Sequence, residues 1–179
     1  SDLDQLVVFL NELKNIKPKK DDKLNTLFNL LMTDPLLKNN KVIIFTEFLA
    51  TARYLHINLK RRGVLNIDAI DSMDNRDRDE VVKQFSPYYN YITSQNIKDK
   101  GKKETKVLIS TDVLAEGLNL QDCTLLINYD IHWSPVRLMQ RVGRIDRRLN
   151  DEIEKDIIAD KPEVKKYRGK IKYWNFLPP

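Results

Sequence analysis

The stretch Val42-Ile43-Ile44-Phe45 is a short, continuous apolar run, and the polar residues Thr46 and Glu47 follow it directly. A run of this length, with no polar residue alternating in it, is typical of a strand that is covered on both faces in a parallel sheet. Other segments have the apolar, β-branched or aromatic content of strands. They are residues 64–70, 107–110, 124–129 and 171–177.

Helical segments alternate with these strands. Apolar residues recur at helical spacing in residues 3–13, 24–31, 48–59 and 81–85. Strands that alternate with helices imply βαβ units and a parallel sheet with helices on both faces. The chain is therefore predicted to be an α/β protein with three layers (α/β/α) around a mainly parallel sheet.

The predicted organisation has N-terminal helices at residues 1–38, which lead into one domain at residues 39–179. Residues 86–105 interrupt the alternation, because a tyrosine-rich start gives way to a polar, lysine-rich stretch. We expect an exposed loop or an insertion there. Residues 150–168 are highly charged, and we expect them to be helical or looped.

The composition is that of a globular protein of 179 residues, with 41% apolar and 32% charged residues. The net charge of +5 permits contact with nucleic acid without requiring it. The single cysteine, Cys123, excludes an internal disulfide and a cysteine-based zinc site, and its apolar surroundings predict an inert buried thiol. No apolar run approaches the roughly 20 residues of a membrane span, and no signal-peptide pattern opens the chain. We expect a cytoplasmic protein, and its ends suggest a piece of a longer one.

A basic stretch follows the helix-start signal Ser134-Pro135. Residues 140–148 read Q-R-V-G-R-I-D-R-R. At 3.6 residues per turn, Gln140, Arg144 and Arg147 share one helix face. Arginine forks bind phosphate through two parallel hydrogen bonds, so this face is suited to an anion with several oxygens. The alternative interpretation is a solvated basic face on a surface helix.

Polar residues stand at the ends of three predicted strands. They are Thr46-Glu47, Thr111-Asp112 and the segment from Asp130 to Trp133. Ligands of open α/β sheets bind beyond the carboxyl ends of the strands. The three groups are therefore expected to converge at one edge of the sheet, which the arginine-rich helix leaves.

Three motifs resemble, in order and spacing, those of the second RecA-like lobe of superfamily 2 helicases. Residues 42–48, V-I-I-F-T-E-F, resemble motif IV, and residues 108–121, L-I-S-T-D-V-L-A-E-G-L-N-L-Q, resemble motif V. Residues 140–147 resemble motif VI, which is written Q-x-x-G-R-x-x-R. The resemblance covers residues 21–149 and the last strand, and it implies a RecA-like fold.

The segment from Asp130 to Pro135 is similar to the D-x-x-W-x-P sequence of Swi/Snf-type translocases. Bacterial members of that group, such as the RNA-polymerase-recycling ATPases, offer the nearest comparison. The resemblance implies the C-terminal motor lobe of an ATP-dependent DNA translocase or helicase. Its partners would be DNA, with a duplex favoured, and an upstream RecA-like lobe. RNA is disfavoured because the DEAD-box form of motif VI begins with His, whereas this one begins with Gln140.

The resemblance implies that Arg144 and Arg147 are catalytic. They would reach across a cleft to ATP, and the last arginine would act as a finger that stabilises charge on the transferring phosphoryl group. Gln140 would contact the same nucleotide or orient the arginines. Gly143 would allow close approach of the helix to its neighbour, unless it is simply a tolerated helix glycine.

The motif V loop would touch the nucleic-acid backbone and sense the nucleotide. Thr111 and Thr46 would contact backbone phosphates, which carry no sequence information. Glu116 and Gly117 belong to the nucleotide-sensing part of the loop. Asp112 would contact the nucleotide or motif VI, or else cap a short helix at residues 113–116.

Four further residues near the motifs are candidates for binding or structural roles. Trp133 could stack on a base or ribose, although packing is favoured for a tryptophan near a helix start. His132 has no second histidine or cysteine nearby, so no metal site is expected. Arg141 and Arg148 are expected to be structural or to face nucleic acid.

The sequence contains no phosphate-binding loop of the form G-x-x-x-x-G-K-[ST] and no D-E-x-H motif. ATP and Mg²⁺ would therefore be held mainly by a first lobe upstream, and this chain alone is expected to be inactive as an ATP hydrolase. The alternative is a non-catalytic nucleic-acid or protein-docking module that keeps the lobe fold.

Overall fold

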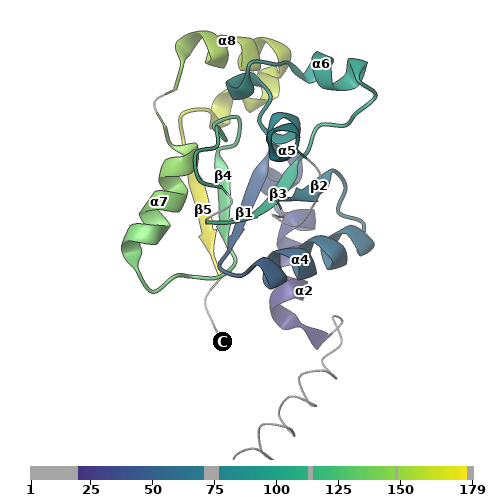
Figure 1. The fold of residues 1–179 in the computed structure, drawn as a ribbon, viewed down its shortest axis with the longest axis vertical. Helices are drawn as coiled ribbons and strands as arrows, with labels where there is room; N and C mark the ends of the chain where they lie inside the picture. The colour runs from purple at the N-terminus through teal and green to yellow at the C-terminus, as the bar shows by residue number, and fades with distance from the viewer. Residues whose placement is uncertain (1–19, 71–76, 113–114, 148, 177–179) are drawn as a thin grey trace, which may run out of the picture.

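The computed structural model of the chain describes residues 20–70, 77–112, 115–147 and 149–176. In this part of the chain, five parallel strands form one sheet with the order β2-β3-β1-β4-β5 (Figure 1). The strands are β1 (Val42–Thr46), β2 (Ile67–Ala69), β3 (Val107–Thr111), β4 (Leu125–Asn128) and β5 (Lys172–Asn175). The predicted parallel sheet is confirmed, although β2 is shorter than the predicted segment 64–70.

Helices cover both faces of the sheet. One face carries α2 (Asp22–Thr33), α3 (Pro35–Asn39) and α4 (Leu49–Arg61). The opposite face carries α5 (Arg78–Phe85) and α7 (Pro135–Ile145). The remaining helical elements are η2 (Tyr88–Asn90), α6 (Ser94–Asp99), α8 (Asp151–Asp160) and η3 (Pro162–Tyr167).

The strand β1 explains why the sheet must be covered on both sides. All five of its residues are buried. Val42 and Ile44 pack against α2 and α4, whereas Ile43 and Phe45 pack against the α5 side, because successive side chains of a strand point to opposite faces. The apolar run therefore stabilises two cores at once, which confirms the three-layer α/β/α architecture.

The chain enters this fold through α2. Asp21 caps the helix, its carboxylate accepting a hydrogen bond from the Leu24 amide at 2.9 Å. Leu24, Leu27 and Leu31 lie in the core beside the sheet. The predicted helix at residues 3–13 lies outside the described residues.

The exposed-loop form of the prediction for residues 86–105 is wrong, whereas the insertion form stays a prediction. The segment forms η2 and α6, and Tyr88 and Tyr89 are buried in a separate cluster with Ile157 of α8. Figure 1 shows α6 and α8 together at one end of the molecule. The polar composition hid this packing, because the two tyrosines bury their rings while their hydroxyls bind carboxylates.

The thiol of Cys123 is buried, as predicted, between β4 and the start of β1. Burial raises its pKa to about 12, so the reactive thiolate is scarce at neutral pH. In the part of the chain that the structure describes, no helix is long and apolar enough to cross a membrane.

Candidate functional site

The guanidinium of Arg141, on α7, lies at the carboxyl ends of the strands and is completely buried. Its Nε and Nη2 donate to the two carboxylate oxygens of Asp112, at 2.7 and 2.8 Å. Its Nη1 donates to the Asn128 side chain at 3.1 Å and to the Asp130 carbonyl at 2.8 Å. A bidentate pair of this kind is a strong and directional contact. Arg141 therefore fixes α7 against the ends of β3 and β4.

The side chain of Asp130 extends this network to β1. Its carboxylate accepts hydrogen bonds from the Thr46 hydroxyl, from the Glu47 amide at 3.3 Å and from Lys23 Nζ at 3.1 Å. Burial alone raises the pKa of Asp130, but these three donors lower it, and the net pKa lies below its usual value. The predicted convergence of three strand ends at one edge is therefore confirmed.

This network contains two of the predicted site residues, Asp112 and Thr46, and shows what each contacts. Asp112 contacts motif VI through Arg141, which was one of the three expectations for it. Thr46 is fully buried, and its hydroxyl is bound to Asp130. The expectation that this hydroxyl contacts a phosphate is not supported by the structure, because it is not exposed.

Arg144 and Arg147 lie over the turn Ala115–Asn119. Arg144 Nη1 donates to the Ala115 carbonyl, and Arg147 Nη1 donates to the Asn119 side chain, both at the long distance of 3.4 Å. Within the described residues, neither forms an ion pair with a carboxylate. The Nε of Arg144 is buried and has no hydrogen-bond partner there. The two guanidiniums thus hold unused donors.

One detail of the predicted geometry is wrong. The helix α7 ends at Ile145, with Asp146 as its C-cap, so Arg147 lies beyond the helix and does not share a helix face with Arg144. The chain bends after Ile145 and brings Arg147 to the same turn instead.

Gln140 and Gly143 lie on the exposed face of α7. A Cβ atom added at Gly143 would meet no atom within 4 Å. The prediction that this glycine allows close approach to a neighbouring element is therefore wrong within the described structure. Both positions remain accessible from outside the domain.

The turn at Glu116 and Gly117 has a conformation that requires glycine. Gly117 has a φ of +76°, in the left-handed region. The Glu116 carbonyl accepts a hydrogen bond from Arg78 at 2.9 Å. Thr111, at the end of β3, is buried and its carbonyl binds the Ala115 amide at 3.1 Å. The predicted motif V residues therefore share one compact connection, apart from residues 113–114, which lie outside the described residues.

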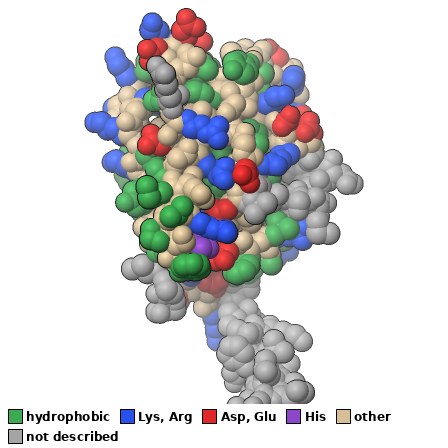
Figure 2. Space-filling model, turned by 60° about the vertical axis from the view of Figure 1, so that its left-hand side comes forward, with side chains coloured by type: hydrophobic (Ala, Val, Ile, Leu, Met, Phe, Trp, Pro, Cys, Tyr) green, Lys and Arg blue, Asp and Glu red, His purple; other side chains and the backbone are tan. Residues whose placement is uncertain are grey.

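The indole of Trp133 is 88% exposed, so the favoured expectation of a packed tryptophan is wrong. Its neighbour His132 is buried instead, and His132 Nδ1 accepts a hydrogen bond from the Ser134 amide at 3.0 Å. Val136 and Met139 continue an exposed apolar strip along α7. On the face of the molecule in Figure 2, hydrophobic side chains lie beside basic and acidic ones.

Several residues that contact this site could not be predicted from the sequence. Lys23, Arg78 and Asn90 reach it from α2, α5 and η2. Each is an ordinary polar residue in its local context, and the partners are 107, 38 and 29 positions away along the chain. Local pattern cannot reveal contacts of that kind.

The fold and the site together define a class of protein, namely RecA-like α/β lobes that carry an arginine-rich helix beside the β3–β4 connection. The helicase conserved C-terminal domain matches residues 22–148, and the chain belongs to this family. The predicted resemblance to a helicase C-terminal lobe is thereby confirmed.

Similar curated proteins include the uncharacterized ATP-dependent helicase YqhH of Bacillus subtilis, which is 35% identical over 75% of this chain and 22% of its own length. The putative ATP-dependent DNA helicase fml2 of Schizosaccharomyces pombe is 29% identical over 84% of this chain and 19% of its own length. The ATP-dependent RNA helicase DBP5 of Meyerozyma guilliermondii is 27% identical over 78% of this chain and 27% of its own length. The chain thus spans about a fifth to a quarter of these relatives.

Solved structures agree on the fold. The C-terminal part of the Fun30 ATPase domain has a TM-score of 0.57 at 19% identity, covering 86% of this chain and 39% of that one. The E. coli DEAD-box protein SrmB, solved with the regulator of ribonuclease activity A, has a TM-score of 0.52 at 20% identity, covering 87% and 84%. Identities this low support the fold alone.

Replacing Arg141 with Met should lower the free energy of unfolding by about 3–5 kcal/mol, because Asp112 would be left as a mostly buried carboxylate without its partner. Urea denaturation measures this loss. The matched control is Arg137→Met, at an exposed position of the same helix, which should change stability by less than about 0.5 kcal/mol. Equal effects of the two substitutions would contradict the assignment of Arg141.

Replacing Asp130 with Asn should lower the free energy of unfolding at pH 7 by about 1–2 kcal/mol, because three donors lose a charged acceptor. The folded-state pKa of Asp130 is lowered, so its stabilisation is complete above the usual aspartate pKa of about 3.9 and disappears as pH falls through the folded value. Urea titrations from pH 7 to pH 3 should show the two proteins converging. A constant difference across this range, or the same difference for the exposed control Asp156→Asn, would refute the prediction.

Proposed function

We propose that this chain is the C-terminal motor lobe of an ATP-dependent DNA translocase, and that it acts as part of a longer protein. In this proposal Arg144 and Arg147 contact the terminal phosphate of ATP, and Arg147 is the arginine finger. Membership of the helicase C-terminal domain family supports the ATP-dependent class.

The observation that carries the proposal is the weak internal bonding of Arg144, which is partly buried, and of Arg147, which is exposed. Their hydrogen bonds to the Ala115–Asn119 turn are long, and Arg144 Nε has no partner among the described residues. A buried donor without a partner costs about 1–3 kcal/mol. A phosphate group would supply several strong acceptors and would offset that cost. Arg141, by contrast, is fully bound inside the protein and has no such role.

The residues present fit a triphosphate only in part. Arg144 and Arg147 supply positive charge, which stabilises charge on the transferring phosphoryl group when ATP is bound. Magnesium is held by carboxylates in such sites, and within the described residues there is no cluster of three metal-ligating side chains. We therefore assign the phosphate loop and the Mg²⁺ ligands to a first lobe elsewhere in the longer protein.

The remaining predicted residues have subsidiary roles in the proposal. Gln140 and Gly143, exposed on α7, face the neighbouring lobe and the nucleotide. Glu116 and Gly117 form the turn that responds to the nucleotide, and Thr111 positions the backbone of that connection beside nucleic acid. Trp133 projects far enough to stack on a nucleotide, since it is 88% exposed.

DNA is favoured over RNA as the substrate, with duplex DNA favoured over single strands. Motif VI begins with Gln140, and the D-x-x-W-x-P sequence at residues 130–135 is similar to that of Swi/Snf-type translocases. The relatives include both a DNA helicase and an RNA helicase by name. The second candidate, a non-catalytic docking module, is less consistent with two arginines that keep unused donors.

Replacing Arg147 with Ala in the longer protein should reduce ATP turnover by about 10³-fold or more, because the finger stabilises transition-state charge. Steady-state phosphate release measures the effect, and thermal unfolding should show an intact fold. The control is Arg137→Ala, on the same helix but away from the turn. Turnover within a few fold of the unsubstituted protein would remove the finger assignment.

Translocation on duplex DNA without strand separation can be tested separately from the role of the arginines. Duplex DNA should stimulate ATP turnover by about tenfold or more, whereas single-stranded RNA should not, and no strand displacement should accompany hydrolysis. Phosphate release and a labelled-strand displacement assay measure the two activities on one preparation. Efficient strand separation, or equal stimulation by RNA, would contradict this part of the proposal.

A further inference from the structure

The turn that contacts Arg144 and Arg147 is also bound by a residue outside the three motifs. Asn90 of η2 donates through Nδ2 to the Asn119 carbonyl at 2.9 Å and to the Ser86 carbonyl at 2.6 Å. The side chain of the same Asn119 is the acceptor for Arg147. Asn119 therefore connects Asn90 to Arg147, the proposed arginine finger.

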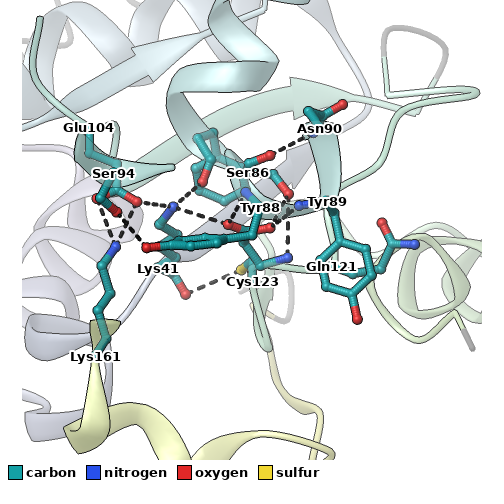
Figure 3. Close-up of polar contacts among 12 residues, drawn as sticks. Lys41, Ser86, Tyr88, Tyr89, Asn90, Ser94, Glu104, Gln121, Cys123 and Lys161 are labelled. Atoms are coloured by element: carbon teal, nitrogen blue, oxygen red, sulfur yellow. Dashed lines mark hydrogen bonds and ion pairs between the residues drawn. The ribbon is translucent and has the colours of Figure 1, made fainter. Parts of the chain in front are cut away.

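The carboxylate of Asp122 fixes η2 to the end of this connection. It accepts hydrogen bonds from the Ser86 hydroxyl at 2.9 Å and from the backbone amides of Tyr88 and Tyr89 at 3.1 and 3.0 Å (Figure 3). Lys41 Nζ lies 3.8 Å from the same carboxylate. Asn90 is therefore carried on a rigidly bound turn rather than on a loose loop.

Arg168 binds two further carbonyls of the connection. Its Nη2 donates to the Gln121 carbonyl and its Nη1 to the Asp122 carbonyl, both at 2.8 Å. Glu154 of α8 binds the other side of the guanidinium, with Nε donating at 2.7 Å. Burial alone lowers the pKa of Arg168, but Glu154 raises it, and the net pKa lies above its usual value. The Arg168 guanidinium therefore stays charged and joins Glu154 to the carbonyls of Gln121 and Asp122.

The location of Arg168 is informative. It lies after residue 148, where the match to the helicase family ends. The η3–β5 region and α8 therefore add a contact that the family motifs do not contain. The Tyr89 hydroxyl joins the two supports, because it donates to Glu154 at 2.8 Å and accepts from the Asn150 amide at 3.1 Å.

We infer that Asn90 and Arg168 are positioning residues, which hold the Asn119–Asp122 segment so that Asn119 and the adjoining turn present Arg147 and Arg144 to the phosphate. Three carbonyls of this segment each receive a side-chain donor from Asn90 or Arg168. This role rests on the proposed function of the arginines. The placement of the segment itself does not, so it can be tested separately.

The first test measures amide hydrogen exchange in this chain. Asn90→Ala should raise exchange across residues 115–122 by about fivefold, because removing one hydrogen bond lowers the local opening free energy. Exchange in β3 and the thermal midpoint should hardly change, since Asn90 is only partly buried. The matched control is Gln95→Ala in α6, whose side chain donates to Asp99 at 2.7 Å, and it should leave residues 115–122 unchanged. Unchanged exchange in Asn90→Ala would overturn the inference.

The second test measures ATP turnover of the longer protein with and without duplex DNA. Asn90→Ala should lower kcat about fivefold while KM for ATP stays within twofold, because a misplaced finger affects the transition state more than ground-state binding. Arg168→Lys should keep the pairing with Glu154 but reach one carbonyl, and it should give a smaller loss than Arg168→Ala. An Asn90→Ala enzyme with unchanged kcat, in a protein whose Arg147→Ala variant is inactive, would refute the positioning role alone. An active Arg147→Ala variant would refute the proposed function instead.

Discussion

The buried pair of Arg141 and Asp112 is the interaction on which the rest of the site depends. Moving a guanidinium and a carboxylate out of water costs several kcal/mol per ion, and the cost is offset only when the geometry is good and the remaining donors are satisfied. Both conditions hold here, because Arg141 also binds Asn128 and the Asp130 carbonyl. The orientation of α7 on the sheet is therefore strongly constrained.

This constraint separates the arginines of α7 and its end into two kinds. Arg141 directs its donors to groups inside the protein. Arg144 and Arg147 form only long hydrogen bonds to the Ala115–Asn119 turn within the described residues, so donors remain for a ligand. An internal ion pair thus fixes the helix, and the fixed helix presents the outer guanidiniums. Preorganised positive charge of this kind stabilises a developing anion without reorganisation during the reaction. Asn90 and Arg168 constrain the adjoining segment in the same way, because they bind the carbonyls of Asn119, Gln121 and Asp122.

Much of the fold could be predicted from the sequence, because strands covered on both faces have an unmistakable apolar pattern, as in β1. The convergence of Thr46, Asp112 and Asp130 followed from the rule that parallel strands end at one edge. Other features could not be predicted, since they depend on tertiary packing. The spacing of Arg147 suggested a helix face, but the helix ends two residues earlier. The supports from Asn90 and Arg168 join residues 29 and 47 positions apart, and no local pattern encodes them.

When nucleotide binds, we expect the guanidiniums of Arg144 and Arg147 to leave the Ala115–Asn119 turn for the terminal phosphate. The most direct measurement is a crystal structure of the longer protein with a non-hydrolysable ATP analogue and Mg²⁺. We expect nitrogen atoms of Arg144 and Arg147 to lie about 3 Å from oxygens of the terminal phosphate, while Arg141 stays on Asp112. A bound analogue whose phosphates are far from both side chains, with each still resting on the Ala115–Asn119 turn, would contradict this expectation.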